Sequence, residues 1–141
     1  MIGMFCGGCA VDSHAIRDDS HEQELLSTSA DLFWEGIRWG DAEKAASFIE
    51  PDDRALFQVR LEEKLEQRRV IEYTILQTTI SPMVDEPASP DDPWRTGTVS
   101  LITESYTMPA QILSKSEIDQ HWYRTPTGWW LNADEVLESM E

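Results

Sequence analysis

The sequence predicts an α+β domain in which three helices pack on a curved, cone-shaped antiparallel sheet of about four strands. Two patterns lead to this prediction. Apolar side chains recur at helical spacing between residues 21 and 69, whereas β-branched and aromatic residues dominate between residues 70 and 132. A chain of 141 residues has room for one core. Residues 21–141 are therefore expected to form a single domain after a flexible tail or tether, residues 1–20.

The first helix is predicted to run from Ser20 to Gly40. Its apolar residues share one face because they recur at spacings of four and three. They are Leu26, Ala30, Phe33 and Ile37. Gly40 can end this helix in a left-handed conformation, and Asp41 can cap the next one. The small-residue face of that second helix consists of Ala42, Ala45, Ala46 and Ile49. Pro51 suits the first turn of a third helix, which continues to Arg69. Its buried stripe is predicted to be Phe57, Leu61 and Leu65.

Strand segments are expected at residues 70–80, 96–108 and 110–119, followed by a pair at residues 120–124 and 129–132. Between the first two lies a segment with four prolines and four acids, residues 81–94, which is predicted to be a long exposed loop. Pro109 is expected to mark a bulge or an edge between the second and third strands. The last two strands meet across the turn Thr125-Pro126-Thr127-Gly128. Residues 134–141 are expected to form a last helical turn or to fray.

The net charge of the chain limits the kinds of partner that it can bind. Asp and Glu number 27 against 11 Lys and Arg, so the formal net charge is −16. A polyanion gains nothing from counterion release, and nucleic acid is therefore not an expected partner. No apolar run reaches the roughly 18 to 20 residues that would span a bilayer, and we expect a soluble chain. With no glycine-rich phosphate loop and no convincing metal-ligand cluster, no cofactor is expected.

Both cysteines lie in the first ten residues, MIGMFCGGCA, and three interpretations stay open. The first is a C-x-x-C pair of Cys6 and Cys9 that acts in redox chemistry or binds a metal. The residues after Cys6 do not predict the helix that lowers the thiol pKa in a redox pair. A zinc site would need His14 and His21 as further ligands, at a spacing that fits no common zinc module.

The second interpretation is a bacterial lipoprotein signal. Gly8-Cys9-Ala10 resembles the end of a lipobox, in which a small residue precedes the cysteine that receives the lipid. The polar residues 12–24 resemble the tether that follows such a signal. Cys6 stands where the signal prefers leucine, and a complete signal would require a start upstream of Met1. This interpretation places the protein in the bacterial envelope, lipid-anchored at Cys9 and periplasmic. The third interpretation is a plain tail on a cytoplasmic protein.

The order of the predicted elements resembles the nuclear transport factor 2-like superfamily. Two segments add to the likeness, WGDAEKAASFI at residues 39–49 and HWYRTPTGWWL at residues 121–131. This cone-shaped fold is shared by that transport factor, ketosteroid isomerase and many polyketide cyclase-like proteins, and the resemblance covers residues 21–132. It implies a pocket between the first helix and the concave face of the sheet, and a homodimer through paired sheets. Cystatin-like folds are the second choice.

The resemblance also implies a search for acid–base groups, because isomerases and dehydratases of the superfamily use them. In the third strand, alternation puts Asp119, His121 and Tyr123 on one face. In an enzyme, His121 would be the general base and Asp119 would orient it, while a tyrosine would donate a hydrogen bond to a developing oxyanion. That donor would be Tyr73, Tyr106 or Tyr123. We favour the alternative, in which these three residues face solvent and Trp122 packs inward.

Tryptophans cluster near the end of the chain, and a small domain needs the area that they bury. Trp122 and one of the neighbours Trp129 and Trp130 are predicted to lie in the core. The other neighbour then faces outward, since adjacent residues on a strand point to opposite faces. Trp34 lies off the apolar stripe of the first helix, where it would face a dimer mate. The residues predicted to bind a ligand or partner are Trp34, Tyr73, Tyr106, Trp129 and Trp130.

Two classes of function therefore remain. We favour a non-catalytic envelope binding module that contacts a protein or a small apolar ligand. The alternative is a cofactor-free isomerase or dehydratase that uses His121 and a nearby carboxylate. An open cavity that contains His121 would favour the enzyme. A cone filled by side chains would favour the module, and the expected filling residues are Phe33, Ile37, Tyr73 and Leu101.

Overall fold

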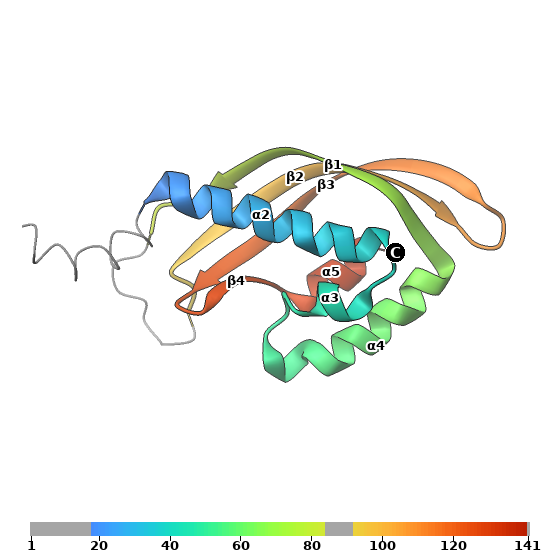
Figure 1. The fold of residues 1–141 in the computed structure, drawn as a ribbon, viewed down its shortest axis with the longest axis horizontal. Helices are drawn as coiled ribbons and strands as arrows, with labels where there is room; N and C mark the ends of the chain where they lie inside the picture. Colours follow the sequence, from blue (N-terminus) through green and yellow to red (C-terminus); the bar gives the residue numbers. More distant parts are fainter. Residues whose placement is uncertain (1–17, 84–91, 141) are drawn as a thin grey trace, which may run out of the picture.

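The computed structural model describes residues 18–83 and 92–140 (Figure 1). In chain order the elements are α2 (Asp19–Arg38), α3 (Ala42–Ala46), α4 (Pro51–Gln67), β1 (Arg68–Ile80), β2 (Arg95–Thr107), β3 (Ile112–Thr125), β4 (Gly128–Leu131) and α5 (Ala133–Ser139). The segment that holds Cys6 and Cys9 lies outside the described residues, as does most of the predicted loop. The hypotheses for these two segments therefore stay predictions.

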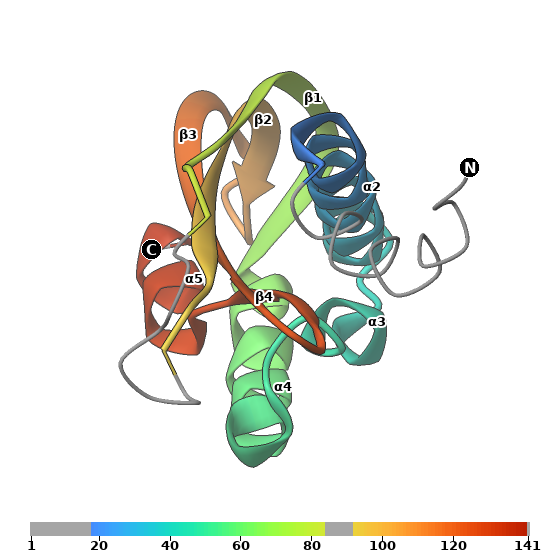
Figure 2. The same ribbon diagram turned by 90° about the vertical axis from the view of Figure 1, so that its left-hand side faces the viewer.

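The strands form one antiparallel sheet in the order β1-β2-β3-β4. Figure 1 shows the long strands arching over α2, and Figure 2 shows α2 and α5 on opposite sides of the sheet, with α4 at its lower end. The predicted α+β class, with N-terminal helices packed against a curved antiparallel sheet, is confirmed. The residues after β4 form the helix α5, whose first turn is capped by the side chain of Asn132.

The first helix begins slightly earlier than its apolar pattern indicates. The Asp18 carboxylate accepts hydrogen bonds from the backbone N–H groups of Ser20 and His21 and so caps the helix. This places α2 partly inside the segment predicted to be a tail. At the other end Gly40 adopts a φ of +71°, as the prediction requires, and Asp41 caps α3 through the N–H of Lys44.

Two helices end before their predicted limits. The C-cap residue of α4, Arg68, is already extended and pairs with Thr107 of β2, so strand pairing ends the helix at Gln67 rather than at Arg69. The helix α3 ends at Ala46, and residues 47–49 continue as turns with short-range backbone bonds. Ile49 is still buried, which explains why the pattern of apolar residues extends past the helix.

The prediction that Pro109 marks a bulge or an edge is wrong. The pairing of β2 with β3 runs without a shift from Arg95 opposite Arg124 to Thr107 opposite Ile112, and Pro109 lies in the turn beyond it. A turn does not require the N–H that proline lacks. The irregularities are in β1 instead, at Ile71 and Leu76, where the register with β2 shifts.

The core lies between α2 and the concave face of the sheet and is rich in aromatic side chains. The ring of Phe33 meets those of Trp34, Trp122 and Phe48 edge to face, at centroid separations of 5.4, 6.3 and 6.4 Å. All three side chains predicted to form the stripe of α4 are also buried: Phe57, Leu61 and Leu65. Gly97 of β2 permits this close packing, because a Cβ there would collide with the Leu26 side chain of α2.

Candidate functional site

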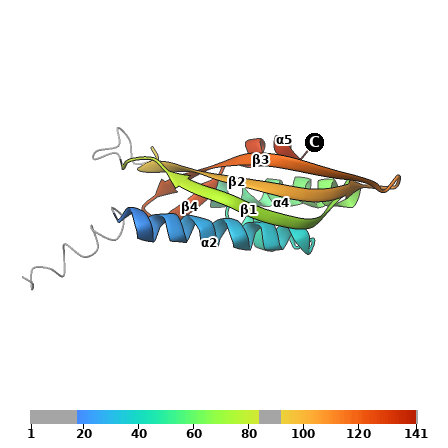
Figure 3. The same cartoon turned by 90° about the horizontal axis from the view of Figure 1, so that it is seen from above.

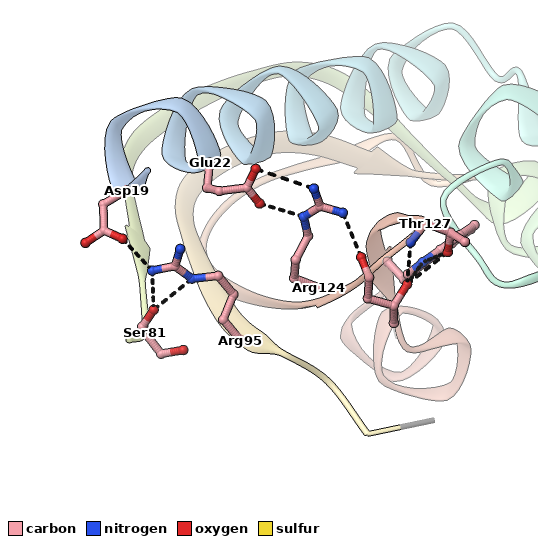
Figure 4. A network of polar contacts seen from close by, with 8 residues as sticks. Asp19, Glu22, Ser81, Arg95, Arg124 and Thr127 are labelled. Carbon is pink, nitrogen blue, oxygen red and sulfur yellow. Dashed lines mark hydrogen bonds and ion pairs between the residues drawn. The ribbon is translucent and has the colours of Figure 1, made fainter. Parts of the chain in front are cut away.

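Near the start of α2, acids of the helix hold two arginines of the sheet (Figure 4). Arg124 Nε donates to Glu22 Oε1 at 2.5 Å, and both residues are buried. Arg95 Nη2 donates to Asp19 Oδ1 and to the carbonyl oxygen of Ser81, each at 2.7 Å. The Glu22 side chain is 1% exposed, so its charge depends on Arg124 for compensation. These ion pairs occupy the space between the first turns of α2 and the sheet.

Trp34 lies in the core, which corrects the prediction that it faces a dimer mate. It is 2% exposed, and its indole N–H donates to Gln120 Oε1 at 3.1 Å. The indole N–H of Trp122 donates to the same oxygen at 3.1 Å. One buried amide thus satisfies two tryptophans, and this explains why the helix tolerates a large side chain away from its apolar stripe.

Three of the four side chains expected to fill the cone are buried. Phe33, Ile37 and Leu101 are at most 1% exposed. Tyr73 is only half-buried, but its ring lies 6.4 Å from that of Trp34. Together with the buried ion pair of Glu22, these side chains take up the space in which the superfamily resemblance implies a pocket.

Trp129 and Trp130 point to opposite faces of β4, as predicted. Trp129 points into the core at 5% exposure, where its ring lies near Gly97, and it is therefore not placed to bind a partner. Trp130 points outward and is half-exposed, with its indole N–H donating to Thr125 Oγ1 at 2.9 Å. Tyr106 is also half-exposed, at the far end of β2.

The other two tyrosines bond to carboxylates on the helical side of the molecule. Tyr73 Oη lies 2.6 Å from Asp31 Oδ1 and 2.8 Å from Glu35 Oε2, so two acids share its one proton. Tyr123 Oη donates to Glu50 Oε2 at 2.9 Å. Burial, reinforced by these bonds, raises the pKa of both phenols well above the usual range. The tyrosines therefore act as neutral donors that tie helical segments to the sheet.

Asp119 and His121 share the outer face of β3 but do not meet in a desolvated site. His121 Nδ1 lies 2.8 Å from Glu135 Oε1 of α5, and the two side chains are 62% and 50% exposed. Asp119 accepts a hydrogen bond from Ser100 Oγ at 2.7 Å instead of orienting the imidazole. The hollow beside them measures only about 20 Å³, far below the roughly 300 Å³ at which ligand pockets begin. This geometry provides a hydrogen bond on the surface, and no shielded base.

A larger cavity lies between α4 and α5, with a volume of about 430 Å³. From α4 it is lined by Arg60, Glu63, Lys64 and Gln67. From α5 it is lined by Asp134, Leu137 and Glu138. A second hollow of about 150 Å³ adjoins it, because the two share Arg60, Asp134 and Leu137. We call the two hollows together the α4–α5 cleft.

The rim of the α4–α5 cleft is partly apolar. Leu56 lines the smaller hollow and is 59% exposed, and Val59 is 55% exposed. Residues three apart share a helix face, so these two side chains form one apolar patch at the edge of the cleft. Leu137 adds an apolar group from α5, although it is itself buried.

Charges of both signs line the α4–α5 cleft. The acids are Asp52, Asp53, Glu63, Asp134 and Glu138, and the bases are Arg60 and Lys64. Within residues 18–83 and 92–140, Arg60 forms no ion pair. Its guanidinium group is therefore available to a carboxylate from outside the molecule.

No residue of the cleft could be assigned a function from the sequence. Each position is an ordinary helix residue when taken alone, and the cleft exists because α5 folds back beside α4. One signal was present: Leu56 and Val59 are apolar but lie off the stripe of Phe57, Leu61 and Leu65. Apolar residues away from the buried stripe of a helix indicate a contact with something else.

Comparisons with known proteins add information on the fold alone. No family model matches the chain, and a search of curated proteins finds no match. Among solved structures, the chain is similar to the solution structure of a SEC-C motif-containing protein from Rhodopseudomonas palustris. The two share 15% sequence identity with a TM-score of 0.50, over 70% of this chain and 68% of that one. The likeness concerns the arrangement of helices and strands.

Proposed function

We propose that this chain is a non-catalytic binding module of the nuclear transport factor 2-like superfamily that receives a protein partner in the α4–α5 cleft. In this proposal it works in the bacterial envelope, tethered by a lipid on Cys9. The observation that carries the proposal is the contrast between a filled interior and an open cleft of about 430 Å³ outside it. An interior packed with aromatic rings and a buried ion pair leaves the surface to make contacts.

A protein suits the cleft better than a small apolar ligand does. Sites for small apolar molecules are lined mostly by apolar and aromatic groups. This cleft is lined largely by charged side chains, and its apolar lining residues are Leu56, Phe57, Ala133 and Leu137. Arginine is one of the three residues most enriched at the energetic hot spots of protein interfaces. Arg60 is therefore the residue expected to contribute most to affinity.

Acid–base catalysis receives less support from the geometry. A general base in an isomerase must be shielded from water so that desolvation can tune its pKa. His121 is 62% exposed, and its nearest carboxylate, Glu135, is 50% exposed. The binding module therefore remains the preferred proposal.

Photo-crosslinking in cells of the native host tests the cleft. A benzoylphenylalanine placed at position 56 or 59 is expected to capture the same partner protein, whereas the same group at Thr96, exposed on β2, should not. Arg60→Glu should abolish capture from both cleft positions, since reversing a hot-spot charge weakens binding by about tenfold or more. Capture that is equal at all three positions, or that is indifferent to Arg60→Glu, would contradict the proposal.

The intact mass of the protein tests the lipid tether separately. The chain should be expressed in a bacterial host from its complete reading frame, including any start upstream of Met1. We expect a product that begins at Cys9 and carries diacylglycerol. An unmodified product that retains Met1 would remove the tether and return the protein to the cytoplasm. The proposal for the α4–α5 cleft would stand in either case.

A further inference from the structure

The turn between β2 and β3 carries a group of exposed apolar side chains. Met108, Ile112 and Leu113 are 43%, 63% and 65% exposed. Tyr106, opposite Leu113 in the strand register, is half-exposed. Figures 1 and 3 show this hairpin projecting beyond the ends of α2 and α4. The apolar group therefore lies on a convex tip, which cannot enclose a ligand but can enter a soft surface.

Arginine and tryptophan side chains lie behind this tip, between β1 and the end of α2. Arg69 of β1 is opposite Tyr106 in the register. Its Nη1 atom would lie 3.3 Å from a Cβ placed on Gly40, so the arginine reaches the end of α2. There Trp39 is 70% exposed, with the Arg38 guanidinium 5.3 Å from the centre of its ring. We call this surface, from Arg38 and Trp39 across Arg69 to the hairpin tip, the hairpin end.

The charge of the hairpin end differs from that of the rest of the chain. Residues 105–116 contain one lysine and no acid, in a protein with a net charge of −16. Two more positive charges come from β1, where Arg68 and Arg69 pair with Thr107 and Tyr106 beside the tip. Acids return two rows further back, where Glu104 lies opposite Glu72 and meets Lys115 at 3.8 Å. A further acid lies at the end of α2, where the indole N–H of Trp39 donates to Glu35 Oε1 at 2.8 Å. At physiological ionic strength the screening length is about 8 Å, which weakens repulsion from acids elsewhere on the molecule.

We propose that the hairpin end binds the surface of an anionic lipid bilayer. Ile112, Leu113 and Met108 enter the boundary between headgroups and acyl chains, where exposed apolar side chains gain most from leaving water. Trp39 lies at headgroup level, the depth that its amphipathic ring prefers. The arginines of the hairpin end pair with lipid phosphates. This contact does not depend on a lipid at Cys9, nor on the α4–α5 cleft.

Sedimentation with vesicles tests the proposal, using the full chain expressed without any lipid. Vesicles of equal parts phosphatidylcholine and phosphatidylglycerol should bind the protein, and vesicles of phosphatidylcholine alone should bind it far less. The double variant Ile112→Ser/Leu113→Ser is expected to bind the anionic vesicles at least about tenfold more weakly. The matched control is Leu32→Ser/Leu76→Ser, which removes two exposed aliphatic groups from the middle of α2 and of β1, away from the hairpin tip, and should bind as the wild type does.

A second variant tests the charges. Arg38→Gln/Arg69→Gln should weaken binding to the anionic vesicles by about tenfold or more, since each arginine near such a surface contributes about 1 kcal/mol. Any of three results would overturn the proposal. These are equal binding by the hairpin variant and its control, equal binding of the wild type to neutral and anionic vesicles, and no binding of the wild type to either. The proposal would also be overturned if the wild type does not bind vesicles and the hairpin variant loses self-association in analytical ultracentrifugation. In that case the surface would join two copies of the chain.

Discussion

Glu22→Gln is expected to lower the free energy of unfolding by about 3–5 kcal/mol. The substitution keeps the size of the side chain and removes its charge, so Arg124 is left as a buried cation without compensation. The Arg124 side chain is 11% exposed, and the acceptors that remain beside it, the new amide oxygen and the carbonyl oxygen of Thr125, are both neutral. Urea denaturation followed by tryptophan fluorescence measures the effect, because the core tryptophans lie close to this ion pair.

Glu24→Gln is the matched control for this prediction. It makes the same change from acid to amide two residues later on α2, at an exposed side chain. Exposed charges contribute little, so the free energy of unfolding should change by less than about 1 kcal/mol. A double replacement, Glu22→Met with Arg124→Leu, should recover most of the loss. A loss below about 1 kcal/mol for Glu22→Gln would mean that the pair is hydrated in solution.

Phe33→Ala is expected to cost about 3–5 kcal/mol of the free energy of unfolding. Phe33 is fully buried, and its ring contacts three other aromatic rings, so its removal leaves a cavity that rigid neighbours cannot close. Thermal and urea denaturation should both report the loss. The variant is also expected to expose apolar surface to a hydrophobic dye before it unfolds completely.

The neighbouring residue provides the control for Phe33. Leu32 is 43% exposed on the same helix, and Leu32→Ala should cost less than about 1 kcal/mol. Equal losses for the two variants would show that α2 is rotated from the position described. A loss below about 1 kcal/mol for Phe33→Ala would show that the wrong face of the helix has been assigned to the core.

Much of the fold could be predicted from local patterns. The stripe of Leu26, Ala30, Phe33 and Ile37 is buried as its spacing indicates, and Gly40 ends the helix region in the conformation that glycine allows. The limits of the elements were harder to predict. Arg68 could extend α4 by its own propensity but pairs with β2 instead, since strand pairing offers its backbone partners that a last helical turn would not.

The positions of individual side chains could likewise be predicted where a local pattern decides them, but not where a distant residue does. Alternation along β3 predicted correctly that Trp122 points inward, and the pairing rule predicted that Trp129 and Trp130 point apart. The assignment of Trp34 to a dimer face failed. A helical wheel shows that this tryptophan lies off the stripe, but not that Gln120, far away in sequence, offers it a buried hydrogen bond.

The sequence by itself determined the α+β class, the buried faces and the strong negative charge, because these follow from the spacing and number of residue types. Only the tertiary structure decided where surfaces meet. The α4–α5 cleft requires α5 to lie beside α4, and the hairpin end requires the register that places Arg69 opposite Tyr106. Both are contacts between residues distant in the chain, and long-range contacts depend on how whole elements pack rather than on any local pattern.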